Sequence, residues 1–223
     1  VLQALGGPPY GEARSSGGLG LPSFGPIPPN SQYSSNDIKV TSSVGYASTT
    51  LTEAGWKLGT ASSSTSEPRS PRPSSGEAGP WREKTIQKTK IPLELTLAVP
   101  KINFLVKTAE YLKNAWGEIG VKVNLDVQDS EKIISETIKN RDYEAILFGN
   151  VLSRGLDLFS FWHSSERFYP GLNIALYNNK KVDGLIEAIR QNLDEEKRRG
   201  QFRELQEKIA HDIPAIFLYS PSY

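Results

Sequence analysis

The chain has 223 residues, with 26 Lys and Arg against 25 Asp and Glu, and it contains neither Cys nor Met. This length suits one domain with irregular attachments, because domains usually hold about 100 to 200 residues. The balanced charge argues against nucleic acid or an anionic membrane as a partner, and the lack of Cys excludes disulfides, thiolate metal sites and cysteine nucleophiles. Since Met is absent, we expect Val1 not to be a translation start and the chain to be either a processed product or, as we favour, a fragment of a longer protein.

The first part of the chain is expected to be mostly irregular. Residues 1–45 are rich in Gly, Pro and Ser and show no period of two or 3.6, which predicts a lead-in loop. In residues 46–59, Leu51 shares one helical face with Ala47, and Gly55 suits a helix end, so a short helix is predicted there.

A second stretch, residues 60–90, is predicted to be an exposed insertion. It is heavy in Ser and Pro and too poor in apolar residues to offset its conformational entropy. Its basic end, residues 82–90, has a single Ile and no interleaved aromatic residues, so we interpret it as a solvated lead-in to the next strand.

Residues 91–223 show the periods of strands and helices, and we assign them to one α/β lobe. The series of strand, helix, strand, helix and strand predicts right-handed crossover units in a sheet covered by helices. Residues 143–148 are mostly apolar, which favours a central strand. The predicted strands are 92–99, 121–127, 143–148, 173–177 and 213–219, and the predicted helices are 102–119, 130–138 (capped by Ser130), 182–191 and 194–210.

Motifs for catalysis or metal binding are missing from the sequence. The two histidines, His163 and His211, have no second ligand at a metal-binding spacing, and His211 is expected to cap the carbonyls at a helix end. There is no Gly-x-Ser-x-Gly elbow, phosphate loop or dinucleotide fingerprint. We therefore predict a protein that is not an enzyme and that holds neither a metal nor a cofactor.

Residues 149–173 are the candidate site. This aromatic-rich segment, GNVLSRGLDLFSFWHSSERFYPGLN, follows a predicted strand at its carboxyl end, where open α/β sheets place their ligands. The alternative is that its aromatic rings only cap the core, and periodicity alone favours neither.

Several segments in order resemble the C-terminal half of the family 5 extracellular solute-binding proteins, which include dipeptide, oligopeptide and nickel binders. The segments are GPIPPNSQY (25–33), LTEAGW (51–56), AEYLKNAWGEIGVKVNL (109–125), YEAILFG (143–149), LDLFSFWHSS (156–165), GLNIALYNNKKVDGLIEAIR (171–190) and FRELQEKIAHDIPAIFLYSPSY (202–223). Their joint order covers most of the chain.

The resemblance implies an α/β lobe of the type II periplasmic-binding-protein kind, a mixed sheet with helices packed on it. It further implies an extracytoplasmic protein, often lipid-anchored, that captures a peptide or similar solute and delivers it to the permease subunits of an ABC importer. The first of the two lobes that close on ligand would be missing from this chain and would be a partner.

The resemblance, together with the position of the loop, implies ligand contacts that can be named. Peptide binders of this family commonly place an acidic residue shortly after the glycine that ends the central strand, where it meets the ammonium group of the peptide. Residues 150–155, which follow Gly149, contain no acidic residue, so this anchoring of the peptide ammonium group is in doubt. Asp157 could instead cap a short helix, Asn173 is favoured as a loop-pinning residue, and Asp183 is expected to start a helix. The predicted ligand-binding residues are Gly149, Asn150, Val151, Leu152, Asp157, Phe161, Trp162, His163 and Asn173.

Two other hypotheses remain open at the level of sequence. Some transcription regulators fuse this lobe architecture to a DNA-binding domain, so the chain could be a ligand-sensing module. Alternatively, the chain by itself binds nothing, because a cleft formed between two lobes has only one wall here.

Overall fold

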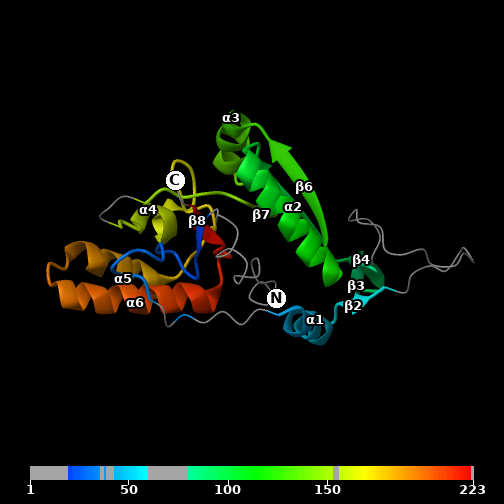
Figure 1. Ribbon diagram of the computed structural model, residues 1–223, viewed down its shortest axis with the longest axis horizontal. Helices are drawn as coiled ribbons and strands as arrows, with labels where there is room; N and C mark the ends of the chain where they lie inside the picture. Colours follow the sequence, from blue (N-terminus) through cyan, green and yellow to red (C-terminus); the bar gives the residue numbers. More distant parts are fainter. Residues whose placement is uncertain (1–19, 36–37, 39–42, 60–79, 153–155, 222–223) are drawn as a thin grey trace, which may run out of the picture.

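The computed structural model describes residues 20–35, 38, 43–59, 80–152 and 156–221. Its elements gather around two hydrophobic cores, one between α2 (Asn103–Glu118) and a parallel sheet and the other around α5 (Lys180–Gln191) and α6 (Glu195–Asp212) (Figure 1). The lead-in residues 1–19 and the Ser/Pro-rich residues 60–79 lie outside the described residues, so the interpretations that fall on them stay predictions.

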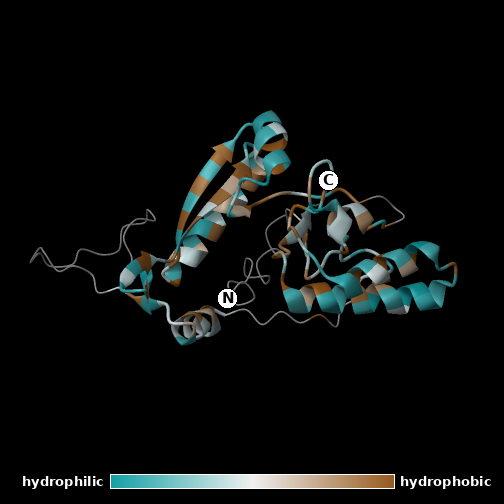
Figure 2. Ribbon diagram, turned by 180° about the vertical axis from the view of Figure 1, so that it is seen from behind, coloured by the Kyte–Doolittle hydropathy of each residue, from teal (hydrophilic) through white to brown (hydrophobic). Residues whose placement is uncertain are grey.

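The first core contains a three-stranded parallel sheet in the order β6-β5-β7, formed by β5 (Glu94–Pro100), β6 (Lys122–Gln128) and β7 (Ala145–Ile146). The register pairs Leu97 with Leu125 on the face toward α2, and Glu94 with Lys122 on the opposite, polar face. Figure 2 shows the resulting alternation of apolar and polar residues along β6. The expected α/β fold is confirmed.

The central strand differs from the prediction for residues 143–148. Among the described strands β5 lies in the middle, and β7 is a two-residue strand at its side. The Leu147 amide still donates to the carbonyl of Ala98, but Phe148 is exposed and the chain then leaves the sheet. The apolar run at 143–148 predicted a buried strand, but the pairing of β7 with β5 ends before the run does.

Helix α2 (Asn103–Glu118) covers the sheet where a helix was predicted at 102–119. Its buried side chains, Leu105, Ala109, Leu112 and Trp116, recur at helical spacing and pack in the first core. Gly120, with φ +84°, adopts the left-handed conformation that ends the helix and turns the chain into β6.

The next predicted helix, at 130–138, begins as an α-helical turn, α3 (Ser130–Lys132), and continues as a π-helix, η2 (Ile133–Ile138). Ser130 does not cap it. The N-cap position is Asp129, whose side chain makes no capping hydrogen bond, and Ser130 is the first helical residue.

Residues 82–92 form a hairpin in the stretch that was interpreted as a solvated lead-in to the next strand. Strands β3 (Arg82–Ile86) and β4 (Thr89–Pro92) pair with each other, and β3 also pairs with β2 (Lys57–Leu58). Most of the hairpin is exposed, but the Arg82 side chain is buried against α1 (Val44–Glu53), the short helix predicted within residues 46–59. Gly55 follows that helix with φ +88°.

The second core is built by α5 (Lys180–Gln191) and α6 (Glu195–Asp212), the two helices predicted at 182–191 and 194–210. Their starts are fixed by side-chain caps. Asn179 accepts hydrogen bonds from Lys181 and Val182, and Asp194 accepts them from the first turn of α6. Asp183, which was expected to start a helix, lies inside the first turn of α5 instead.

After α6 the chain runs between the two cores. A strand was predicted at 213–219, but the structure has strand only at β8 (Tyr219–Pro221), which pairs antiparallel with β1 (Gly20–Pro22). The left-handed Ile213, with φ +51°, ends α6. His211 was expected to cap carbonyls, but its Nδ1 lies 3.1 Å from the Asp212 carboxylate.

Candidate ligand-binding site

The candidate site lies at the carboxyl end of the parallel sheet. From β5 the chain passes through α2 to β6 on one side, whereas β7 lies on the other side of β5. Open α/β sheets bind ligands at such a switch point, because the loops of neighbouring strands diverge there. The segment after β7 leaves the sheet at this point and runs toward α4 (Phe159–Trp162) and the second core (Figure 1).

Four predicted site residues lie on this departing segment. Gly149 and Asn150 are exposed, Val151 is 89% exposed, and Leu152 is half-buried. An exposed valine beside exposed backbone offers a ligand both an apolar contact and peptide groups for hydrogen bonds.

Asp157 has two partners in the structure. Its Oδ1 accepts a hydrogen bond from the Phe159 amide at 3.1 Å just before α4, although the N-cap position of that helix is Leu158 and not Asp157. Its Oδ2 lies 3.1 Å from Nη2 of Arg190. The Arg190 guanidinium in turn stacks on the Phe159 ring, 4.5 Å from its centroid. The carboxylate therefore joins the start of α4 to α5.

The aromatic residues divide between core and rim. Phe161 is half-buried, and Trp162 is buried in the second core against Tyr177 and Phe217, so its ring caps the core. Phe168 and Tyr169 are both more than three-fifths exposed.

His163 is buried and its ring is held from three sides. It stacks on Phe159 with ring centroids 4.2 Å apart, Nδ1 accepts the Ser165 amide, and Nε2 lies 3.3 Å from Oε1 of Glu187. These contacts place His163 between α4 and α5.

Asn173 is fully buried and pins the loop. Its Nδ2 donates to the carbonyls of His163 (3.1 Å) and Tyr177 (2.9 Å), and its Oδ1 accepts the Tyr177 amide at 3.1 Å. These bonds fold residues 173–177 into a turn, with Leu176 at φ +53°, where a strand was predicted. The loop-pinning role is the one that the geometry supports.

Asp183 connects the same loop to α5. Its carboxylate accepts the Ser164 amide at 2.8 Å and the Ser164 hydroxyl at 2.6 Å, and Lys180 Nζ lies 3.1 Å away. Burial raises the pKa of Asp183, but the hydrogen bonds from Ser164 and Lys180 outweigh it and hold that pKa below its ordinary value. The two hydrogen bonds between Ser164 and Asp183 fix the position of the 163–173 loop on the second core.

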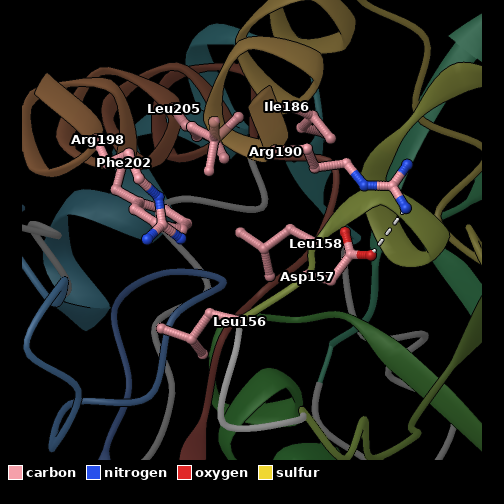
Figure 3. Close-up of a pocket in the computed structure, with 9 residues that line it drawn as sticks. Leu156, Asp157, Leu158, Ile186, Arg190, Arg198, Phe202 and Leu205 are labelled. Atoms are coloured by element: carbon pink, nitrogen blue, oxygen red, sulfur yellow. Dashed lines mark ion pairs between the residues drawn. The ribbon is translucent and has the colours of Figure 1, made fainter. Parts of the chain in front are cut away.

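A hollow of about 220 Å³ opens beside Asp157, between α5, α6 and the chain that enters α4 (Figure 3). Most of its lining is apolar, and three charged side chains complete it. The lining residues are Leu156, Asp157, Leu158, Ile186, Ile189, Arg190, Arg198, Phe202 and Leu205.

Sequence reasoning missed several residues that shape this region. Arg141 donates to the backbone carbonyls of Ile138, Arg167 and Gly171 and so ties the loop to the end of η2. Ser164, Arg190 and Arg198 were also missed. An arginine among carbonyls leaves no periodic pattern in the sequence, and the spacing of His163, Ser164 and Asp183 becomes informative only after the fold is known.

No group of three or more metal-ligating side chains comes together in the part of the chain that the structure describes. Within those same residues, no helix combines the length and the apolar character that a membrane crossing needs.

The protein-family model described as bacterial extracellular solute-binding proteins, family 5 Middle, matches residues 13–167 of the chain. The chain belongs to this family. Among curated proteins, this family 5 chain is 28% identical over 106 residues to the oligopeptide-binding protein AppA of Bacillus subtilis (strain 168). That match covers 47% of the chain and 19% of AppA.

Solved structures of solute-binding proteins share the fold of this family 5 chain. AppA of Bacillus subtilis, in complex with a nonapeptide, superimposes with a TM-score of 0.74 at 24% identity over 99% of this chain and 40% of AppA. The oligopeptide-binding protein of Thermus thermophilus with a pentapeptide gives 0.78 at 20% identity, covering 99% of this chain and 36% of that protein. NikZ of Campylobacter jejuni with Ni(L-His) gives 0.72 at 18% identity, covering 97% and 40%.

These likenesses establish the type II periplasmic-binding-protein fold. The chain spans well under half the length of each of these relatives.

Proposed function

We propose that this chain supplies one lobe of an extracytoplasmic solute-binding protein that captures peptides for an ABC importer. The other lobe and the permease subunits would be its partners, and the chain itself would perform no reaction. Membership of family 5 and the fold shared with peptide-complexed relatives support this role.

The observation that favours a peptide over other solutes is the exposed segment at the switch point. Gly149, Asn150 and Val151 present backbone and one apolar side chain to solvent, and this segment has no charge that would require a complementary charge on the ligand. Backbone pairing with an extended ligand gives affinity that depends little on the ligand's side chains.

A pair of substitutions at Val151 tests the proposal in the protein encoded by the full reading frame. Val151→Pro removes the amide hydrogen of the segment, whereas Val151→Ala keeps it and trims only the side chain. We expect peptide affinity, measured by calorimetry with the peptides that co-purify and are identified by mass spectrometry, to fall about tenfold for Val151→Pro.

Val151→Ala should remain within about threefold of the unsubstituted protein, and both variants should keep its melting temperature because residue 151 is exposed. Equal affinity in all three proteins would show that residue 151 does not contact the peptide. Co-purification of a metal complex without peptide would exclude the peptide role.

A further inference from the structure

His163 is a buried imidazole whose two ring nitrogens have different partners. Nδ1 lies 3.2 Å from the amide nitrogen of Ser165 and 2.8 Å from its hydroxyl, whereas Nε2 lies 3.3 Å from Oε1 of Glu187. A backbone amide can only donate, so Nδ1 must present a lone pair to it. The proton of the neutral ring is therefore on Nε2, where it faces Glu187.

The hydrogen bond from Ser165 caps a short 3-10 helix, η3 (Ser164–Glu166), at the start of the 163–173 loop. His163 is the N-cap residue of this helix, and its ring accepts the Ser165 amide. A second proton on the ring would occupy Nδ1, because both nitrogens of an imidazolium are donors, and the amide would lose its acceptor. The Ser165 hydroxyl can accept from Nδ1 instead, since it is 2.8 Å away. Protonation of His163 therefore removes the cap of η3 without leaving the ring unpaired.

Two carboxylates of α5 face the other nitrogen of the ring. Glu187 Oε1 lies 3.3 Å and Asp183 Oδ1 lies 3.9 Å from Nε2 of His163. Burial raises the pKa of Asp183, but hydrogen bonds from Ser164 and Lys180 hold this pKa below its ordinary value, so Asp183 is ionised wherever an imidazole titrates. A charged ring would therefore gain attraction to α5 as it loses its bond to the loop.

The other charged groups on the elements packed against the ring already have partners. Lys180 and Arg190 of α5 are each paired with an aspartate, at 3.1 Å in both cases. On the loop, Glu166 accepts a hydrogen bond from the Ser165 hydroxyl, and Arg167 donates to a backbone carbonyl of η3. Helix α4 has no charged residue. The two carboxylates at Nε2 are therefore the charges that a protonated ring meets first.

We propose that His163 is a pH-dependent switch: the neutral ring holds the loop through the Ser165 amide, and the protonated ring releases this amide and pairs with Glu187 and Asp183. The change falls between about pH 5 and about pH 8, where an imidazole gains its charge. Asn173 holds both ends of η3, with its side chain on the residue before the helix and its amide on the last helical residue. These contacts do not involve the ring, so the release is confined to η3. The switch does not depend on the peptide role proposed above.

Nuclear magnetic resonance of the 223-residue chain follows the ring and the amide in one titration. From about pH 8 to about pH 5, we expect the His163 nitrogens to change from the Nε2–H tautomer to the doubly protonated ring. Over the same interval the hydrogen-exchange protection factor of the Ser165 amide, which corrects for the intrinsic pH dependence of exchange, should fall about tenfold. The Asn173 amide, which donates to the carbonyl of Glu166, is the internal control and should keep its protection within about twofold.

Two substitutions separate the switch from a merely structural role. In His163→Gln the side chain cannot titrate, so Ser165 protection should vary by less than about twofold over the same range. Glu187→Gln removes a carboxylate that stabilises the charged ring and should lower the midpoint of the His163 transition by about half a pH unit. The control Glu207→Gln, at an exposed position of α6, should change that midpoint by less than about 0.1 pH unit.

A melting curve checks that each variant is folded, and the titration of the unsubstituted chain decides the matter if His163→Gln is not. Three results would each overturn the proposal. They are a ring that keeps its Nε2–H tautomer at about pH 5, Ser165 protection that does not follow the ring, and equal midpoints in Glu187→Gln and Glu207→Gln.

Discussion

A single buried amide determines the path of the loop that precedes α5. The fully buried Asn173 side chain donates to two carbonyls and accepts one amide, all of them from the buried residues His163 and Tyr177. Asn173→Ala would leave the Tyr177 amide and carbonyl without partners, at about 1 to 3 kcal/mol for each unsatisfied group, whereas the His163 carbonyl would still accept the Glu166 amide. We expect the free energy of unfolding by urea to fall by about 3 kcal/mol. Asn178→Ala, at an exposed position in the same loop, should change it by less than about 0.5 kcal/mol, and similar losses in both variants would contradict this account.

The Asp183 carboxylate makes stability depend on pH. Its pKa is lower in the folded protein than the ordinary value of 3.8, so the unfolded state binds the proton more readily. The stabilisation is therefore complete above the unfolded pKa and is lost as the pH falls through the folded pKa. Between about pH 6 and about pH 3, Asp183→Asn should show a shallower loss of unfolding free energy than the unsubstituted chain. Asp142→Asn, at an exposed position, is the control, and equal slopes for all three proteins would refute the assignment.

At the scale of elements, Arg82 joins parts of the chain that are far apart in sequence. Its guanidinium donates to the Ser48 and Thr52 hydroxyls of α1, to the Trp56 carbonyl and to the Ile119 carbonyl at the end of α2. The side chain is buried, and burial lowers the pKa of Arg82 without removing its charge. The hairpin that starts at this residue is thereby attached to the first core.

Arg82→Met should lower the free energy of unfolding by about 3 kcal/mol, because the buried Ile119 carbonyl and the half-buried Trp56 carbonyl lose their donor. Lys57→Met, an exposed residue on the neighbouring strand β2, is the matched control and should be nearly neutral. Thermal melts of both variants measure the difference. An Arg82 variant as stable as the Lys57 variant would show that the guanidinium does not hold the elements together.

Elements with a strong period could be predicted from the sequence, and those defined by contacts could not. The apolar stripe of α2 is a local signal, and both α2 and α6 were located closely. The short strand β7, the turn at 173–177 and the hairpin at Arg82 depend on partners 30 or more residues away or on a single side chain. The candidate segment at 149–152 could be placed because its position follows from strand order, whereas the hollow beside Arg198 requires two helices to be brought together.

At the scale of the whole molecule, residues 215–218 pack against both cores. Ala215 and Phe217 pack against the second core, and Ile216 and Leu218 pack against the first. The alternation has the period of an extended chain, which explains why residues 213–219 resemble a strand in the sequence although most of them form no ladder.

Substitutions in this segment should affect the two cores separately. Phe217→Ala removes a ring that contacts Trp162, so it should lower hydrogen-exchange protection of the Leu205 and Ile209 amides in α6. Ile216→Ala should instead lower protection in β5 and α2. Because each side chain packs against only one core, the loss of hydrogen-exchange protection should be at least about tenfold larger in that core than in the other. Equal losses on both sides in both variants would mean that the two cores open as one cooperative unit.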